Sequence, residues 1–266
     1  MLSSERQDKI SEIILREGKA HIKNLSALFG VTGETIRRDL NELAKENKIK
    51  KVHGGAIAIK RPLRQESYAR RLKRNIEEKR RIGKYAAQFI SDNDVIAIDF
   101  GAATESLAQA IFNVHNIKIL TNSIHIAGIL AKKHEHGDFT GSIILLGGEV
   151  DCDNECAVGP MTNEMLKPFI VDKAFIGATS ISSKGIMAWD ANIGIFASLL
   201  IKKAGEVYIL AESSKFGKET FYTICGLESA DHIVTDNREP IDQEIIKTAN
   251  ACNTQLHVID MEGVMT

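Results

Sequence analysis

The sequence predicts a mixed α/β protein made of a small helical N-terminal domain and a larger domain with a mostly parallel sheet. Three observations predict this division. Apolar residues recur at helical spacing over residues 1–57, strand-like and helix-like segments alternate over residues 76–266, and the sign of the charge changes between the two parts. Residues 58–75 form a basic connector between the predicted domains.

Charge is distributed unevenly along the chain. Residues 1–81 contain 21 Lys and Arg against 11 Asp and Glu, a net charge of +10. Residues 82–266 contain 13 against 24, a net charge of −11. Such asymmetry is typical of a polyanion-binding module joined to an acidic body. The alternative is a solvated basic face that binds no partner.

The composition excludes several classes of protein. With 44% hydrophobic and 26% charged residues and only 4 Pro, the chain is neither collagen-like nor largely disordered. Charged residues interrupt the first apolar stretch, which argues against a signal peptide, and no segment approaches the roughly 20 apolar residues that span a bilayer. Four Cys in a chain of this length do not predict a disulfide framework, so we expect a cytoplasmic protein.

The first 57 residues predict three helices and a hairpin. The first helix carries apolar Leu2, Ile10, Ile13 and Ile14 and stops at Gly18. The second carries Ile22, Leu25, Leu28 and Phe29 and ends at Gly30, and the third begins after the N-cap residue Thr32 with Ile36, Leu40 and Leu43 inside. The short turn between the last two helices is typical of a helix-turn-helix. Residues 48–57 form two strand-like runs around a Gly-Gly turn, which predicts a wing.

The third helix carries side chains suited to DNA. Thr32, Glu34 and Thr35 lie in its first turn, the part of a recognition helix that meets base edges. Arg37 and Arg38 are able to bind phosphates or the acceptor atoms of guanine. Because Asp39 would repel phosphate, we expect it to face inward and pair with an arginine.

This segment resembles the N-terminal signature of the DeoR family of bacterial transcriptional regulators. The resemblance rests on Arg6, Ile10 and Ile14, on residues 32–40 and on residues 53–56. It implies a winged helix-turn-helix that binds double-stranded operator DNA. The residues expected to contact DNA are Thr32, Gly33, Glu34, Thr35, Arg37, Arg38, Lys51 and His53. Lys51 stands where the family usually has Arg, so it keeps the charge without the forked geometry.

The larger domain alternates between strands and helices. The predicted strands are Val95–Ile98, Lys118–Leu120, Ile143–Leu146, Val171–Ile176, Glu206–Leu210, Ile233–Thr235 and Gln255–Val258. The predicted helices include Ile76–Ile90, Glu105–Phe112, Ser123–Lys133 and Gln243–Asn250. This alternation predicts a parallel sheet with helices on both faces.

Two of these strands end in turns that suit an anion. A strand ending at Asp99 turns through residues 101–104 into a helix, where backbone N–H groups and the Thr104 hydroxyl are able to donate. Residues 121–123 repeat the arrangement after the next strand, with Ser123 as an N-cap. Turns at the carboxyl ends of neighbouring parallel strands form the crevice in which open α/β sheets bind ligands. Lys215 follows a later strand and would neutralise a phosphate. The alternative is that these are plain connections and a solvated lysine.

The larger domain resembles the DeoR effector domain, which is similar in fold to ribose-5-phosphate isomerase. The resemblance is carried by Arg71, Asn75, Glu78 and Lys79 and by residues 99–104, 121–123, 146–148, 172–177 and 211–217. It implies a phosphorylated small-molecule effector, a homodimer or homotetramer and no cofactor. The residues expected to bind the effector are Asp99, Gly101, Ala102, Ala103, Thr104, Thr121, Asn122, Ser123, Gly148, Lys79 and Lys215.

The chain departs from the family pattern near this crevice. Ala102 and Ala103 replace residues that usually carry hydroxyls, Glu212 replaces a frequent Asp, and residues 191–198 are apolar where the family has charged side chains. We therefore expect a ligand less polar than the common hexose monophosphates, or differently shaped.

The sequence predicts a transcriptional regulator, most simply a repressor, and leaves two alternatives. An isomerase-like enzyme with a DNA-binding appendage is disfavoured because Thr179 and Ser180 stand where the isomerases place acidic residues. An architectural DNA-binding protein with an oligomerising second domain is the other alternative. Cys152 and Cys156 flank an acidic loop, and without a nearby His they make an incomplete metal site.

Overall fold

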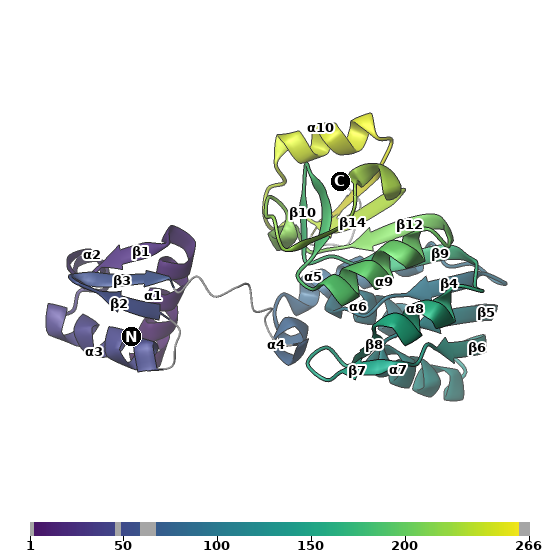
Figure 1. Ribbon diagram of the computed structural model, residues 1–266, viewed down its shortest axis with the longest axis horizontal. Helices are drawn as coiled ribbons and strands as arrows, with labels where there is room; N and C mark the ends of the chain where they lie inside the picture. The colour runs from purple at the N-terminus through teal and green to yellow at the C-terminus, as the bar shows by residue number, and fades with distance from the viewer. Residues whose placement is uncertain (1–2, 46–48, 59–67, 261–266) are drawn as a thin grey trace. The chain divides into compact units, whose positions relative to one another are not determined.

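The computed structural model describes residues 3–45, 49–58 and 68–260, and the chain forms two compact units, Met1–Leu63 and Arg64–Thr266 (Figure 1). Leu2, as well as residues 59–67 of the predicted connector, lie outside the described residues. Within the described ranges, no helix combines the length and the apolar character needed to cross a membrane.

The smaller unit is a winged helix-turn-helix. Its elements are α1 (Ser3–Glu17), β1 (Lys19–His21), α2 (Ile22–Phe29), α3 (Gly33–Lys45), β2 (Ile49–Val52) and β3 (Gly55–Ala58). The strands form an antiparallel sheet in the order β1-β3-β2. The buried core consists of Ile10, Ile14, Leu25, Ile36, Leu40, Leu43, Ile49 and Ala56. The three predicted helices and the hairpin are confirmed.

Two details of this unit differ from the prediction. Strand β1 was not predicted, and it pairs with β3 because Gly55 leaves room for it: a Cβ at Gly55 would lie 2.1 Å from the carbonyl oxygen of Ala20. Leu28, expected on the apolar side of α2, is 65% exposed. At 3.6 residues per turn, Leu28 points roughly 90° away from the mean direction of the other three apolar side chains of that helix.

The larger unit is built on a seven-stranded parallel sheet. Its strands are β4 (Val95–Ile98), β5 (Val114–Thr121), β6 (Phe139–Leu145), β9 (Val171–Gly177), β12 (Ala204–Leu210), β14 (His232–Asp236) and β15 (Gln255–Ile259). They lie in the order β15-β14-β12-β9-β4-β5-β6, and every neighbouring pair is parallel. All seven predicted strands are confirmed.

Helices cover both faces of this sheet, as predicted. Side chains of α5 (Ile76–Ala87), α6 (Ala102–Ala110) and α7 (Ile124–Glu135) pack with Ile96 and Ile98 in one buried cluster. Side chains of α8 (Pro160–Leu166), α9 (Ala191–Ile201) and α10 (Gln243–Ala251) belong to a second cluster, which includes Ala97. Successive strand residues therefore face opposite layers, which explains why the strands are apolar throughout.

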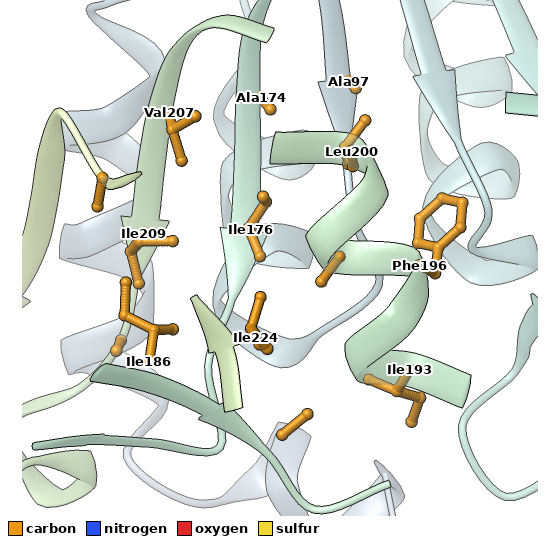
Figure 2. Close-up of a cluster of buried hydrophobic side chains, with 14 of the residues drawn as sticks. Ala97, Ala174, Ile176, Ile186, Ile193, Phe196, Leu200, Val207, Ile209 and Ile224 are labelled. Atoms are coloured by element: carbon orange, nitrogen blue, oxygen red, sulfur yellow. The ribbon is translucent and has the colours of Figure 1, made fainter. Parts of the chain in front are cut away.

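Helix α9 forms much of the second layer. Ile193, Phe196 and Leu200 of this helix belong to the same buried cluster as Ile176 and Ile209 of the sheet (Figure 2). Removing a fully buried side chain such as Phe196 typically costs about 3–5 kcal/mol of stability. The apolar run at residues 191–198 therefore contributes to the hydrophobic core of the larger unit.

Several small elements complete the unit. A second antiparallel sheet, in the order β10-β11-β13, is made of β10 (Ser180–Ser182), β11 (Gly185–Ala188) and β13 (Tyr222–Cys225). A hairpin is made of β7 (Glu149–Asp151) and β8 (Cys156–Val158). Helix α4 (Tyr68–Lys73) precedes α5, and the 3-10 helices are η1 (Ser213–Lys215) and η2 (Leu227–Ser229). The sequence did not predict these two small sheets.

Candidate functional site

Helix α3 presents its polar side to solvent. The Thr32 hydroxyl accepts the N–H of Thr35 at 3.2 Å and so caps the helix as predicted. Burial of Ile36, Leu40 and Leu43 fixes the rotation of the helix. As a result Glu34, Arg37 and Arg38 are exposed, and Arg37 donates to Glu34 at 3.1 Å.

Asp39 faces inward and pairs with an arginine, as predicted. The Arg6 guanidinium donates from Nε to one carboxylate oxygen at 2.6 Å and from Nη2 to the other at 3.2 Å. The side chain of Gln7 donates to the same carboxylate. This bidentate pair joins α1 to α3 and neutralises the one acidic group in the middle of the recognition helix.

The predicted wing residues lie at the surface. Lys51 and His53 are exposed, and the Lys51 ammonium donates to the side-chain oxygen of Asn41 on α3. Gly33 and Thr35 are partly buried. The structure thus places all eight residues predicted to contact DNA on the smaller unit, six of them exposed.

The larger unit contains a cavity at the carboxyl ends of β4, β9 and β12. Its lining combines basic, acidic and apolar residues: Arg71, Lys79, Phe100, Gly101, Ala102, Ala103, Gly177, Ala178, Thr179, Ala188, Ile193, Leu210, Ala211, Glu212 and Lys215. Five residues predicted to bind the effector are among them: Gly101, Ala102, Ala103, Lys79 and Lys215.

Three basic side chains and one carboxylate meet at this cavity. Lys79 is 4% exposed, and its ammonium donates to the carbonyl oxygens of Arg71 and, at 3.3 Å, of Leu72. Burial lowers the pKa of Lys79, while the nearby Glu212 carboxylate raises it. The Lys215 ammonium lies 3.8 Å from Glu212. With three cations against one anion, the group carries a formal charge of +2.

Glu212 is held in place by the turn that follows β12. The N–H and the hydroxyl of the next residue, Ser213, both donate to Asp236, at 2.9 and 2.7 Å. One oxygen of Glu212 accepts the Ser214 hydroxyl at 3.2 Å. Its other oxygen is buried and has no hydrogen-bond partner among the described residues.

Arg71 was not predicted to bind the effector. Its guanidinium donates to the side-chain oxygen of Asn154 at 2.5 Å and lies 5.3 Å from the ring centroid of Tyr68 and 5.9 Å from that of Phe100. Sequence reasoning assigned Arg71 to a basic connector. The family resemblance, which includes Arg71, was the one sequence signal that could have indicated a role at the site. The local sequence does not predict that α4 packs against the cavity.

The second predicted turn does not line the cavity. The Ser123 side chain caps α7 by accepting the N–H of Ile126, and the Thr121 hydroxyl accepts the N–H of Ser123. Asn122 pairs with Ala157 of β8 through both its side chain and its carbonyl. The β7-β8 hairpin therefore takes up hydrogen-bonding groups of this turn, and residues 121–123 are not among the residues that line the cavity. This corrects the expectation that both turns form one crevice.

Three further predicted residues do not belong to the cavity lining. Thr104 is fully buried and its hydroxyl donates to the carbonyl of Gly101 at 3.0 Å, so it stabilises the turn from within. Gly148 packs against Thr162, whose hydroxyl would lie 2.1 Å from a Cβ there. Asp99 is 2% exposed and accepts the N–H of Phe100 at 2.8 Å, and burial raises its pKa to about 8.

The cysteines of the incomplete metal site, and other side chains able to carry chemistry, do not form a metal site in the described part of the chain. Cys156 is buried in β8 whereas Cys152 is exposed, and no cluster of three His, Cys, Asp or Glu suited to a metal occurs in the described part of the chain. His134 and His136 are exposed at the end of α7. Trp189 packs against the core cluster that includes Ile193.

Comparisons with known proteins agree on both units. Residues 6–62 match the model of the DeoR-like helix-turn-helix domain, and residues 74–237 match that of the DeoR C-terminal sensor domain. The HTH-type transcriptional repressor GlcR of Bacillus subtilis (strain 168) is 32% identical over 236 residues, which cover 89% of each chain. The glycerol-3-phosphate regulon repressor of Escherichia coli (strain K12) is 30% identical over 242 residues, 91% of this chain and 94% of that one. Among solved structures, ribose 5-phosphate isomerase A of Methanocaldococcus jannaschii is 15% identical, with a TM-score of 0.39, over 55% of this chain and 56% of that one.

The raised pKa of Asp99 predicts how stability depends on pH. The folded protein keeps Asp99 protonated up to about pH 8, whereas in the unfolded chain Asp99 ionises near its ordinary pKa of 3.8. Asp99 therefore lowers the free energy of unfolding progressively as pH rises between these values. Asp99→Asn keeps an acceptor for Phe100 and removes the titration, so its thermal midpoint should fall less than that of the wild type between pH 5 and pH 8. Melting curves at four pH values test this, and parallel curves for the two proteins would contradict it.

Proposed function

Because the chain belongs to the DeoR family of transcriptional regulators, we propose that it is a repressor whose operator affinity is controlled by a phosphorylated metabolite. In this proposal residues 1–57 bind double-stranded operator DNA, and residues 58–75 connect them to the sensor. Residues 76–266 bind the effector and hold the copies of a homodimer or homotetramer together.

The observation that carries the effector proposal is the charge of the cavity. Arg71, Lys79 and Lys215 face one carboxylate, Glu212, and the formal charge of +2 matches the charge of about −1.5 to −2 that a phosphate monoester carries at pH 7. Beside it, the N-terminus of α6 at residues 101–103 adds backbone N–H groups and the positive end of the helix dipole. A glycerol-3-phosphate regulon gives one of the similar repressors its name, which also favours a phosphorylated ligand.

The rest of the cavity favours a ligand body with few polar groups. Phe100, Ala178, Ala188, Ile193 and Leu210 supply apolar surface to the lining. Such a wall leaves the hydroxyls of a hexose without partners, and unpaired buried polar groups are costly. We infer a compact monophosphate, and we infer binding without catalysis because Ala178, Thr179 and Ser180 after β9 supply no carboxylate to act as a base.

The DNA proposal rests on the exposed face of α3. Arg37 and Arg38 lie on that face, while Asp39, the acidic neighbour that would oppose a phosphate, is neutralised by Arg6. The first turn of α3 carries the exposed Thr32 and Glu34 for contacts with base edges. The partly buried Thr35 lies in the same turn.

Replacing Arg37 and Arg38 together by Ala should abolish specific DNA binding and leave the fold intact, because both side chains are exposed. Each lost contact is expected to cost about 1–3 kcal/mol of binding. The measurement is a gel shift on a duplex that the wild-type protein selects from a random library, with Arg80→Ala on α5 as the control. Wild-type affinity in the double variant would refute the DNA-binding assignment.

Lys215→Ala should keep operator binding and lose the response to the effector, because the ammonium neutralises the phosphate at the cavity and is remote in sequence from the DNA-binding unit. Sugar monophosphates that raise the melting temperature of the wild-type protein serve as probes, and calorimetry measures their affinity. Lys184→Ala, exposed outside the cavity lining, is the control. Unchanged ligand affinity in Lys215→Ala would exclude this cavity as the site.

The protein should assemble as a homodimer or homotetramer. One winged helix-turn-helix of this size contacts only a short DNA site, so a specific operator requires two or more copies in repeated half-sites. Light scattering of the free protein and of its complex with the selected duplex measures the mass. A monomer in both states would contradict the expectation.

A further inference from the structure

Helix α4 is the first described element after residues 59–67, and it contributes a side chain to the cavity. Arg71 of this helix belongs to the lining, together with Lys79 of α5 and Lys215 of η1. Three separate elements therefore bring one cation each to the same space. Of these three elements, α4 lies within residues 58–75, the predicted connector to the DNA-binding unit.

Polar contacts hold α4 at both of its ends, beside the ring contact of the buried Tyr68 with His125. The Tyr68 hydroxyl donates to the buried Glu105 of α6 at 2.7 Å, and Arg71 donates to Asn154 in the loop of the β7-β8 hairpin. The Lys79 ammonium binds the carbonyl oxygens of Arg71 and Leu72, near the C-terminal end of the helix. Of the six residues of α4, Tyr68 alone is classed as buried.

The same arrangement gathers like charges. Burial lowers the pKa of Lys79 most, and the nearby cations Lys215 and Arg71 lower it further. Two carboxylates oppose them, Glu212 in the lining and Glu105 of α6. Repulsion among the three cations opposes the docking of α4, since α4 carries one of them. An anion bound between them would turn this repulsion into attraction. The forked guanidinium suits this role because it binds two phosphate oxygens at once.

We propose that Arg71 is an effector-binding residue supplied by α4, so that a phosphate in the cavity bridges Arg71, Lys79 and Lys215 and clamps α4 onto the sensor domain. This proposal rests on the proposed function of the cavity and adds how ligand binding is sensed. The ligand binds the docked arrangement of α4 better than any undocked one, which is the differential affinity that coupling requires. By the same linkage, any change that loosens α4 must weaken phosphate binding.

Two variants of neighbouring residues on α4 test the assignment. Arg71→Gln removes the cation from the cavity lining, and Arg70→Gln removes the same charge from the exposed neighbour outside it. The probe is the sugar monophosphate that most stabilises the wild-type protein against heat. We expect Arg71→Gln to weaken calorimetric affinity about tenfold, since a hydrogen bond to a charged group is lost, and Arg70→Gln to retain wild-type affinity. Equal affinities in the two variants would overturn the proposal.

Hydrogen exchange tests the clamp itself. The amide of Arg74, the residue after α4, donates to the Arg70 carbonyl of the helix at 3.1 Å. With saturating probe, this amide and those of α4 should exchange more slowly in the wild type and in Arg70→Gln but not in Arg71→Gln. Tyr68→Phe removes the hydrogen bond to Glu105 without changing a residue of the cavity lining. It should therefore speed hydrogen exchange of the α4 amides and lower the affinity for the probe. Unchanged exchange of α4 in wild-type protein that binds the probe would overturn the clamp and leave the effector site standing. A wild-type protein that binds neither inorganic phosphate nor any sugar monophosphate would overturn both.

Discussion

The parallel arrangement of the seven strands is the constraint on which the sensor site depends. Parallel strands place all their carboxyl ends at one edge, so the residues that follow them meet there. The chain passes from β4 to β5 and β6 on one side and later from β9 to β12, β14 and β15 on the other, so the direction of winding reverses between β4 and β9. Residues after these two strands diverge to opposite faces, and the space between them is the crevice in which open α/β sheets bind ligands. The cavity is lined by the segments after β4, β9 and β12, as this rule requires.

The same rule explains which predicted residues line the cavity. Residues 101–103 follow β4 at the reversal point and belong to the lining. Residues 121–123 follow β5, which lies on the other side of β4 from β9, and there the β7-β8 hairpin takes up their hydrogen-bonding groups. Both turns have the sequence of a strand-to-helix connection, so only the order of the strands distinguishes them. That order depends on pairing between distant segments, which the local sequence does not reveal.

Local patterns predicted the elements well and their partners poorly. Periodicity of apolar residues predicted all seven strands of the main sheet, and the Gly30 and Thr32 boundaries predicted the helix-turn-helix. Strand β1 and the sheet β10-β11-β13 were missed because their strands are only three or four residues long, and β1 and β13 also pair with distant segments. Arg71 was missed for the same reason, since only the docking of α4 brings it to the cavity. The inward pairing of Asp39 was predictable because a carboxylate on a DNA-binding helix needs a cation.

In both units a carboxylate lies beside basic side chains and offsets part of their positive charge. In the smaller unit, Arg6 satisfies Asp39 with two hydrogen bonds, so this pair is neutral and Asp39 does not offset the charge of Arg38. Arg37 pairs with Glu34 at the exposed surface, where water screens the pair. In the larger unit, Glu212 opposes three cations and leaves an excess that a single phosphate dianion balances. The two excesses differ in accessibility: the first lies on an exposed helix face that suits an extended duplex, and the second lies in a cavity between strand ends that suits a small anion. In the proposed function, accessibility therefore distinguishes the anion that each unit would bind, although both would be attracted by the same charge.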